Sequence, residues 1–179
     1  MWVVLPKSEL QKHTVAAARE WAMEHQPVSA EDLALDVLVG LSHALHHLAA
    51  LHLMCDPRDL GRCVGDRSDN WFSELRPTTQ STALKTQPSR PSVDPFAFDA
   101  ALFIYDRYPG GIGLSKQLPR SIADLFEQVH MMISRCICEG GCPSCLGAFA
   151  SPCAALKTAT IYFLQSMLQR CQNNQETAA

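Results

Sequence analysis

The chain has 179 residues, of which 47% are hydrophobic, so it is long enough for one domain with a buried core and too short for a motor with two large lobes. Its net charge of −3 and isoelectric point near 6.1 exclude a generally basic surface that holds nucleic acid by charge alone. No segment reaches about 18 uninterrupted apolar residues, so we expect a soluble protein without a membrane span.

The first third of the chain predicts one strand followed by two helices. A short apolar run at residues 2–5 ends at Pro6, which indicates a strand leading into a turn. Apolar residues then recur at helical spacing and predict a helix over about residues 9–24. Ser29 starts a capping-box sequence, and the leucine-rich segment 33–54 that follows is apolar on nearly every face. We therefore expect this segment to be the central helix of the core.

The predicted central helix carries four histidines. His43 is spaced from His46 and from His47 so that the rings of each pair share one face of a helix. A second metal site is one interpretation. The other is that these are half-exposed or core histidines, which we favour because no Asp or Glu lies near them on the helix and no His-Glu-x-x-His motif is present.

The middle of the chain contains an insertion followed by a strand. Residues 66–94 are rich in Ser, Thr and Pro with almost no apolar period, which predicts a flexible insertion after a short strand around residues 60–64. The apolar run 100–105 predicts a buried strand that ends at Asp106. Glycines follow this strand, and their backbone N–H groups form a candidate anion site, although no Walker A motif is matched and a tight turn is the alternative use.

Two further helices are predicted on either side of a cysteine-rich segment. Apolar residues form a helical stripe over residues 122–133 and another over residues 156–168. Pro119 lies at or near the start of the first of these helices, and the tail 172–179 is polar.

Between these helices, four of the eight cysteines form a Cys-x-Cys-x3-Cys-x2-Cys pattern: Cys136, Cys138, Cys142 and Cys145. Intervening glycines and Pro143 let the backbone turn, so the four sulfurs can converge on one tetrahedral ion. We predict one zinc ion. An iron–sulfur cluster also takes four thiolates but usually has other spacings, and disulfides are disfavoured in the cytoplasmic location that we expect from an N-terminus unlike a secretory signal.

The predicted zinc site is structural, because four cysteines complete the tetrahedral shell whereas catalytic zinc keeps a position open for water. Cys153 lies eight positions beyond Cys145, close enough to replace a ligand or to shield the site.

These motifs resemble a known family, the C-terminal zinc-binding domain of mitomycin-repair-type superfamily 2 helicases, found also in related phage-defence proteins. The resemblance lies in residues 104–114, in residues 136–145 and in the His-rich helix that runs into residues 55–61. It covers nearly the whole chain apart from the insertion and the two ends. It implies that the four clustered cysteines bind zinc, and that ATP hydrolysis needs a partner chain because no Walker A motif and no Asp-Glu-x-His box are present.

We therefore expect a single α+β domain over residues 1–179, with a small mixed sheet packed on the central helix and a four-cysteine zinc knuckle between the last two helices. The expected function is that of a non-catalytic accessory domain in DNA repair or phage defence, which docks on a superfamily 2 motor subunit and supports its binding to DNA and its translocation. The candidate residues for contact with DNA, phosphate or a partner are Arg107, Tyr108, Gly110, Gly111 and Lys116.

Two alternatives stay open. The first is a metal-dependent hydrolase or nuclease that uses His43 and His47 with Asp106. The second is a stand-alone remnant of a helicase C-terminus.

Overall fold

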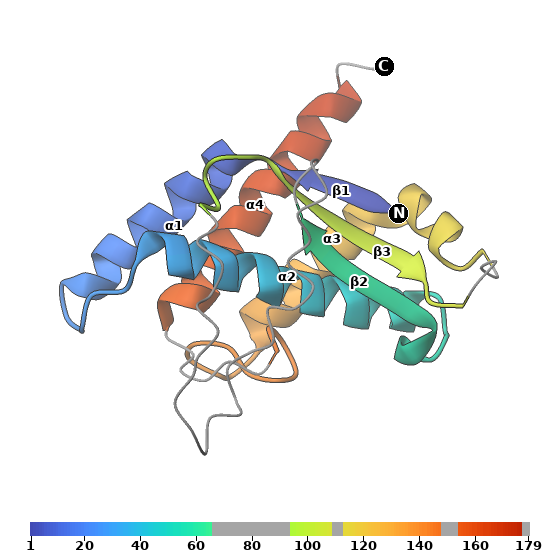
Figure 1. The fold of residues 1–179 in the computed structure, drawn as a ribbon, viewed down its shortest axis with the longest axis horizontal. Coiled ribbons are helices and arrows are strands. Elements are labelled where there is room, and N and C mark those ends of the chain that lie inside the picture. The colour runs from blue at the N-terminus through green and yellow to red at the C-terminus, as the bar shows by residue number, and fades with distance from the viewer. Residues whose placement is uncertain (66–93, 109–112, 148–153, 177–179) are drawn as a thin grey trace.

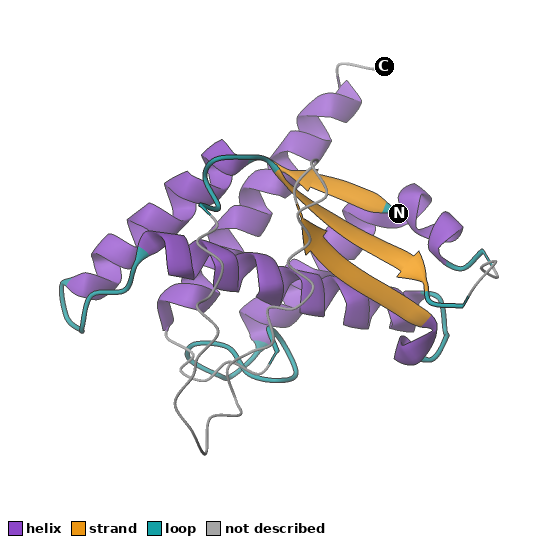
Figure 2. Cartoon of the chain, in the orientation of Figure 1, coloured by secondary structure: helices purple, strands orange, loops and turns teal. Residues whose placement is uncertain are grey.

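The structure, a computed structural model, describes residues 1–65, 94–108, 113–147 and 154–176 (Figure 1). A small sheet and four α-helices make up the described fold (Figures 1 and 2). In chain order the elements are β1 (Trp2–Leu5), α1 (Lys7–Ala22), α2 (Ala30–His52), the 3-10 helix η1 (Pro57–Asp59), β2 (Leu60–Gly65), β3 (Ala100–Asp106), the 3-10 helix η2 (Ser115–Ser121), α3 (Ile122–Arg135) and α4 (Ala154–Glu176). The predicted flexible insertion, apart from its last residue, lies outside the described residues.

The sheet has the strand order β1-β3-β2, with β3 in the middle and antiparallel to both neighbours. Val3 lies opposite Leu102, and Arg62 lies opposite Ile104. The prediction of an α+β fold with a small sheet is confirmed, but its description as a mixed sheet is wrong for the described strands. β1 and β2 point in the same direction, but β3 lies between them and is antiparallel to both. The described strands therefore contain no parallel hydrogen-bonded pair.

Helix α2 is the central element that the sequence predicted. Its first turn is capped by the Ser29 hydroxyl, which accepts a hydrogen bond from the Asp32 N–H at 3.3 Å. The helix contacts β2 and all three other α-helices. It is long and apolar enough to cross a membrane by length and composition, but 67% of its most apolar window is buried inside the protein. Its apolar surface is therefore used as that of a core helix.

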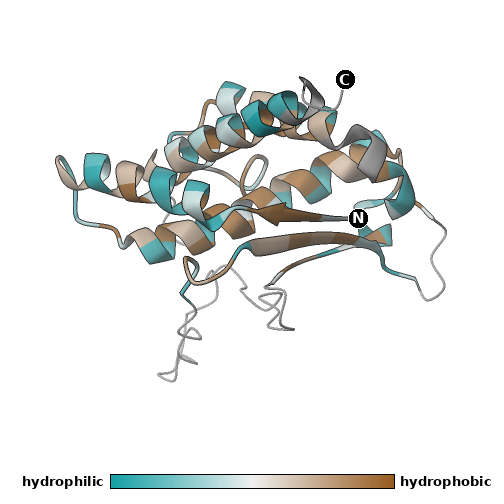
Figure 3. Cartoon of the chain, turned by 90° about the horizontal axis from the view of Figure 1, so that it is seen from above, coloured by the Kyte–Doolittle hydropathy of each residue, from teal (hydrophilic) through white to brown (hydrophobic). Residues whose placement is uncertain are grey.

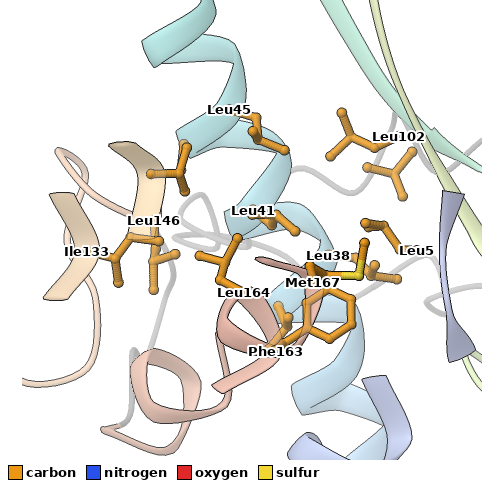
Figure 4. Close-up of a cluster of buried hydrophobic side chains, with 14 of the residues drawn as sticks. Leu5, Leu38, Leu41, Leu45, Leu102, Ile133, Leu146, Phe163, Leu164 and Met167 are labelled. Carbon is orange, nitrogen blue, oxygen red and sulfur yellow. The ribbon is translucent and has the colours of Figure 1, made fainter. Parts of the chain in front are cut away.

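The core lies between the inner face of the sheet and the four α-helices. Figure 4 shows Leu41 and Leu45 of α2 beside Leu102 of β3, with Phe163 of α4 and Ile133 of α3 completing the cluster. All five side chains have no exposed surface. Polar residues lie mainly on the outward faces of the helices, as the hydropathy colouring shows (Figure 3). Leu146, from the segment that follows α3, belongs to the same cluster and packs against this apolar centre (Figure 4).

Candidate metal centre

The four clustered cysteines bring their sulfur atoms together between α3 and α4. All four Sγ atoms lie within 4.8 Å of one another. The shorter separations are 3.5 Å for Cys138–Cys145 and 3.6 Å for both Cys136–Cys142 and Cys142–Cys145. A tetrahedral zinc with Zn–S bonds of about 2.3 Å requires sulfur separations of about 3.8 Å. The sulfurs can therefore hold one zinc ion with only small adjustments.

The backbone of the cysteine loop, residues 136–147, turns around Cys142. The Cys142 carbonyl oxygen accepts hydrogen bonds from the N–H groups of Cys145, Leu146 and Gly147, each at 3.0 Å. In return the Cys142 N–H donates to the Cys145 sulfur at 3.2 Å. Gly141 has a φ of +120°, a conformation that L-residues rarely adopt. These bonds fold the Cys-Pro-Ser-Cys step into the tight turn that the sequence predicted.

The metal-free thiols of this loop differ in acidity. Burial raises the pKa of Cys145 to about 12. Burial also acts to raise the pKa of Cys142, but hydrogen bonds from the Ser144 backbone and from neighbouring thiols outweigh it and lower that pKa to about 7. Cys142 therefore deprotonates at a lower pH than Cys145. Because zinc binds thiolates, metal binding at this loop releases protons.

Lys157 of helix α4 is hydrogen-bonded to the backbone of the cysteine loop. The Lys157 ammonium donates hydrogen bonds to the carbonyl oxygens of Cys136 at 2.6 Å and of Cys138 at 2.8 Å. Sequence reasoning missed this contact, because a lysine in a helix carries no local signal of a partner about 20 residues earlier.

Helix α2 supports the loop from the other side. His43 Nε2 lies 2.9 Å from the Pro143 carbonyl oxygen, and since a carbonyl only accepts, this nitrogen carries the proton. Burial and the nearby Arg62 lower the pKa of His43, so the neutral ring is favoured. Gly147 has a φ of +97°, and a Cβ there would lie 3.3 Å from the His43 ring. The absence of a side chain at Gly147 thus lets the loop approach α2 closely.

The histidines of α2 do not form a second group of three or more metal-ligating atoms within the described residues. In the part of the chain that the structure describes, the four cysteines are the only group of three or more His, Cys, Asp or Glu ligand atoms that could hold a metal. His43 and His47 stack in parallel with ring centroids 6.5 Å apart, and His46 Nε2 is bonded to the Leu60 carbonyl oxygen at 2.9 Å. These contacts are those of helix histidines used in packing.

Asp106 has a local structural role at the end of β3. Its carboxylate accepts hydrogen bonds from the N–H groups of Gly113 at 2.7 Å and of Ser115 at 2.8 Å. The bond from Ser115 contributes most to lowering the pKa of Asp106. Asp106 thereby fixes the start of η2, which is consistent with the tight turn considered from the sequence.

The described members of the candidate contact residues lie at this same end of the sheet. Arg107, Tyr108 and Lys116 are exposed, whereas Gly110 and Gly111 lie outside the described residues. Cys153 lies outside them as well. The predicted ligand role of the four cysteines and the predicted DNA contacts remain predictions at this stage.

Sequence reasoning also missed two aromatic side chains on the outer face of the sheet, Trp2 and Tyr105, which are 63% and 47% exposed. The Tyr105 ring lies over Gly61, where a Cβ would come within 2.3 Å of the ring. Trp2 pairs with Phe103, two residues before Tyr105, so all three side chains share this face. The period-two alternation of β1 and β3 was the signal that could have revealed them.

Comparisons with known proteins agree on one relationship. The family model described as the MrfA Zn-binding domain matches residues 41–146, more than half of the chain. The chain is 31% identical over 143 residues to the uncharacterized ATP-dependent helicase YprA of Bacillus subtilis (strain 168), a match that covers 80% of this chain and 15% of that protein.

Two solved structures are also similar. The crystal structure of the DUF1998 helicase MrfA bound to DNA has 26% identity and a TM-score of 0.52, over 79% of this chain and 15% of that chain. The structure of MrfA bound to DNA and AMPPNP has 28% identity and a TM-score of 0.46, over 72% and 14%. The chain therefore spans about 15% of the length of the helicases that it matches.

Proposed function

Because this chain belongs to the MrfA Zn-binding domain family, we propose that it acts as a non-catalytic zinc-binding accessory domain of a DNA helicase system. In this proposal it works in the cytoplasm, in DNA repair or phage defence, and docks on a superfamily 2 motor subunit. The motor hydrolyses ATP, and the domain supports its binding to DNA and its translocation. The observation that carries the proposal is the convergence of four cysteine sulfurs within 4.8 Å, inside the segment that matches a zinc-binding domain of helicases.

We assign one zinc ion to Cys136, Cys138, Cys142 and Cys145. Four thiolates complete a tetrahedral shell, so no position is open for a water nucleophile and the metal acts as a structural element. Zinc bound there joins the end of α3 to the segment leading into α4, a stretch without helix or strand in its described part. The metal thereby supplies the stability that this loop does not obtain from regular secondary structure.

We assign contact with single-stranded DNA to the exposed end of the sheet, where Arg107 and Lys116 are available for phosphates. Trp2, Tyr105 and Tyr108 expose 63%, 47% and 60% of their surface, and exposed aromatic rings stack on unpaired bases. Nearby negative charge is partly compensated. The Asp106 carboxylate is bonded to backbone N–H groups, and Asp56 is paired with Arg58 at 3.1 Å. The related helicase MrfA is bound to DNA in its crystal structure, which supports a place for this domain family in a DNA-binding protein.

The proposal is tested with a helicase motor that lacks this domain. Fluorescence anisotropy of labelled single-stranded DNA is measured with the motor alone and with the motor plus this domain, alongside ATPase activity. We expect the domain to bind the motor, to tighten DNA binding and to hydrolyse no ATP by itself. Hydrolytic or nuclease activity in the isolated domain would contradict the non-catalytic role. A domain that binds neither motor nor DNA would favour the remnant.

A paired variant tests the DNA surface. Arg107→Ala with Lys116→Ala should weaken DNA binding and reduce its salt dependence, because each phosphate contact releases counterions. The matched control is Lys12→Ala with Arg19→Ala, which removes two exposed cations from α1. Equal losses in both double variants would mean that only total charge matters and would overturn the assigned surface.

A further inference from the structure

Lys157 occupies an electrostatically unfavourable position for a cation. It lies in the first turn of α4, which begins at Ala154 and has no acidic residue in that turn. The N-terminal end of a helix carries the positive end of the helix dipole, so it disfavours a lysine and favours negative charge. In the part of the chain that the structure describes, no ion pair joins Lys157 to a carboxylate. A different negatively charged group near Lys157 would therefore be needed to offset this unfavourable interaction.

The contacts of Lys157 identify that source. Its half-buried side chain reaches the carbonyl oxygens of Cys136 at 2.6 Å and of Cys138 at 2.8 Å. Both residues belong to the four-cysteine cluster. The same contacts place the first turn of α4, with its positive dipole end, next to the cysteine loop. Positive charge on Lys157 and the positive end of the α4 dipole thus lie near the four-cysteine cluster, which becomes strongly negative when it binds zinc.

The net charge of that group follows from its ligands. Four thiolates and one Zn²⁺ carry a total charge of −2. We propose that Lys157, together with the N-terminal end of α4, compensates this charge and positions the two carbonyl groups of the ligand loop. Lys157 is then a positioning residue of the zinc site and also the link that couples zinc retention to the packing of α4. The inference rests on the proposed four-cysteine zinc site and is independent of the helicase role.

The coupling has a measurable consequence. Residues that support metal ligands from outside the coordination shell typically change metal affinity by about 10- to 100-fold when they are replaced. Lys157→Met keeps much of the side-chain volume and removes the charge and both hydrogen bonds. Lys157→Arg keeps the charge. A charge-compensating role therefore predicts rapid zinc loss in the first variant and near-normal retention in the second.

The experiment measures the rate at which the zinc-loaded full chain transfers zinc to an excess of a chromophoric chelator. The matched control is Phe163→Leu, which disturbs the buried core on the same helix and leaves both hydrogen-bond donors of Lys157 in place. All variants are compared at a temperature where circular dichroism shows them folded. We expect Lys157→Met to release zinc about 10-fold faster or more, with Lys157→Arg and Phe163→Leu within a few-fold of the unmodified chain.

Three results would overturn the inference: an unchanged release rate in Lys157→Met, an equal rate in Lys157→Met and Phe163→Leu, or equally fast release in Lys157→Arg and Lys157→Met. If Lys157→Met does not fold, Lys157→Gln retains an amide donor while losing the charge, and the same comparison applies to it. Absence of zinc from the unmodified chain would overturn the zinc site itself. Normal zinc content with unchanged release in the variant overturns the role of Lys157 alone.

Discussion

The sheet and the cysteine loop both pack against α2, but different forces hold them in place. The sheet is fixed by two antiparallel ladders and by side chains such as Leu102 and Ile104, which have no exposed surface. The cysteine loop has neither helix nor strand, three of its four cysteines are only partly buried, and its backbone is held by Lys157 and His43. The sheet is therefore held by backbone pairing and core burial, whereas the loop depends on a metal and on its neighbours.

Breaking the metal site should have the largest effect. Cys142→Ser removes one thiolate, and zinc binding in zinc-finger peptides is worth about 10–16 kcal/mol, as much as the whole stability of a typical domain. We expect one zinc per chain in the unmodified protein, and loss of both zinc and folding in the variant. Metal content is measured by mass spectrometry on protein purified without added metal, and folding by circular dichroism.

The same measurement can refute the site. Two metals per chain, or one metal that survives Cys142→Ser, would indicate that the histidines of α2 bind metal and would favour the hydrolase alternative. Cys63→Ser is the matched control, since Cys63 lies on β2, outside the cluster. It should leave zinc content unchanged.

A cavity on the sheet side of the core should lower the free energy of unfolding and leave the zinc content unchanged. Leu102→Ala removes a fully buried side chain that faces α2 (Figure 4), which costs about 2–5 kcal/mol in protein cores. Urea unfolding should show this loss while zinc per chain stays at one in the folded variant. If Leu102→Ala protein were folded but had lost its zinc, zinc retention in the cysteine loop would depend on the packing of the sheet, contrary to this comparison.

A methyl group between α2 and the cysteine loop should have an intermediate effect. Gly147→Ala forces an L-residue into a φ of +97° and brings a Cβ within 3.3 Å of the His43 ring. Backbone strain of this kind costs about 1–3 kcal/mol. Gly113→Ala is the control, because Gly113 has a φ of +82° with nothing within 4 Å of its Cβ position. Urea unfolding should show a larger loss for Gly147→Ala, and equal losses would mean that the contact with α2 is unimportant.

The smallest expected effect is a pH dependence at the edge between α2 and β2. Burial and the nearby charges of Arg62 and His47 lower the pKa of His46 from 6.5, although its bond to the Leu60 carbonyl opposes the shift. The unfolded chain therefore binds more protons near this pH. The contribution of His46 to the free energy of unfolding is fully present above pH 6.5 and decreases as the pH falls below 6.5.

His46→Gln should flatten this dependence. Unfolding free energies measured between pH 7.5 and 6.0 should fall less steeply in the variant than in the unmodified chain. The exposed His52, also on α2, provides the control for loss of one imidazole, and equal slopes in His46→Gln and His52→Gln would contradict the role of His46. An unchanged slope in His46→Gln would assign the pH dependence to another group.

Much of the fold followed from periodicity. The predicted helix at 9–24 is α1 at Lys7–Ala22, and the predicted central helix at 33–54 is α2 at Ala30–His52. The predicted strand at 100–105 is β3, with one additional residue. Apolar spacing alone could not give the direction of neighbouring strands, because strand pairing depends on how distant segments meet, and the sheet proved antiparallel.

The sequence by itself identified the four cysteines of the candidate metal centre, since four cysteines within ten residues can converge through local turns at Gly141 and around Cys142. Only the tertiary structure decided what surrounds that centre. Lys157 and His43 reach the cysteine loop from helices about 20 and 100 residues away in the chain. Such contacts arise when α2 and α4 bury their apolar faces together, and this burial follows the shape of the whole core, which no local pattern encodes.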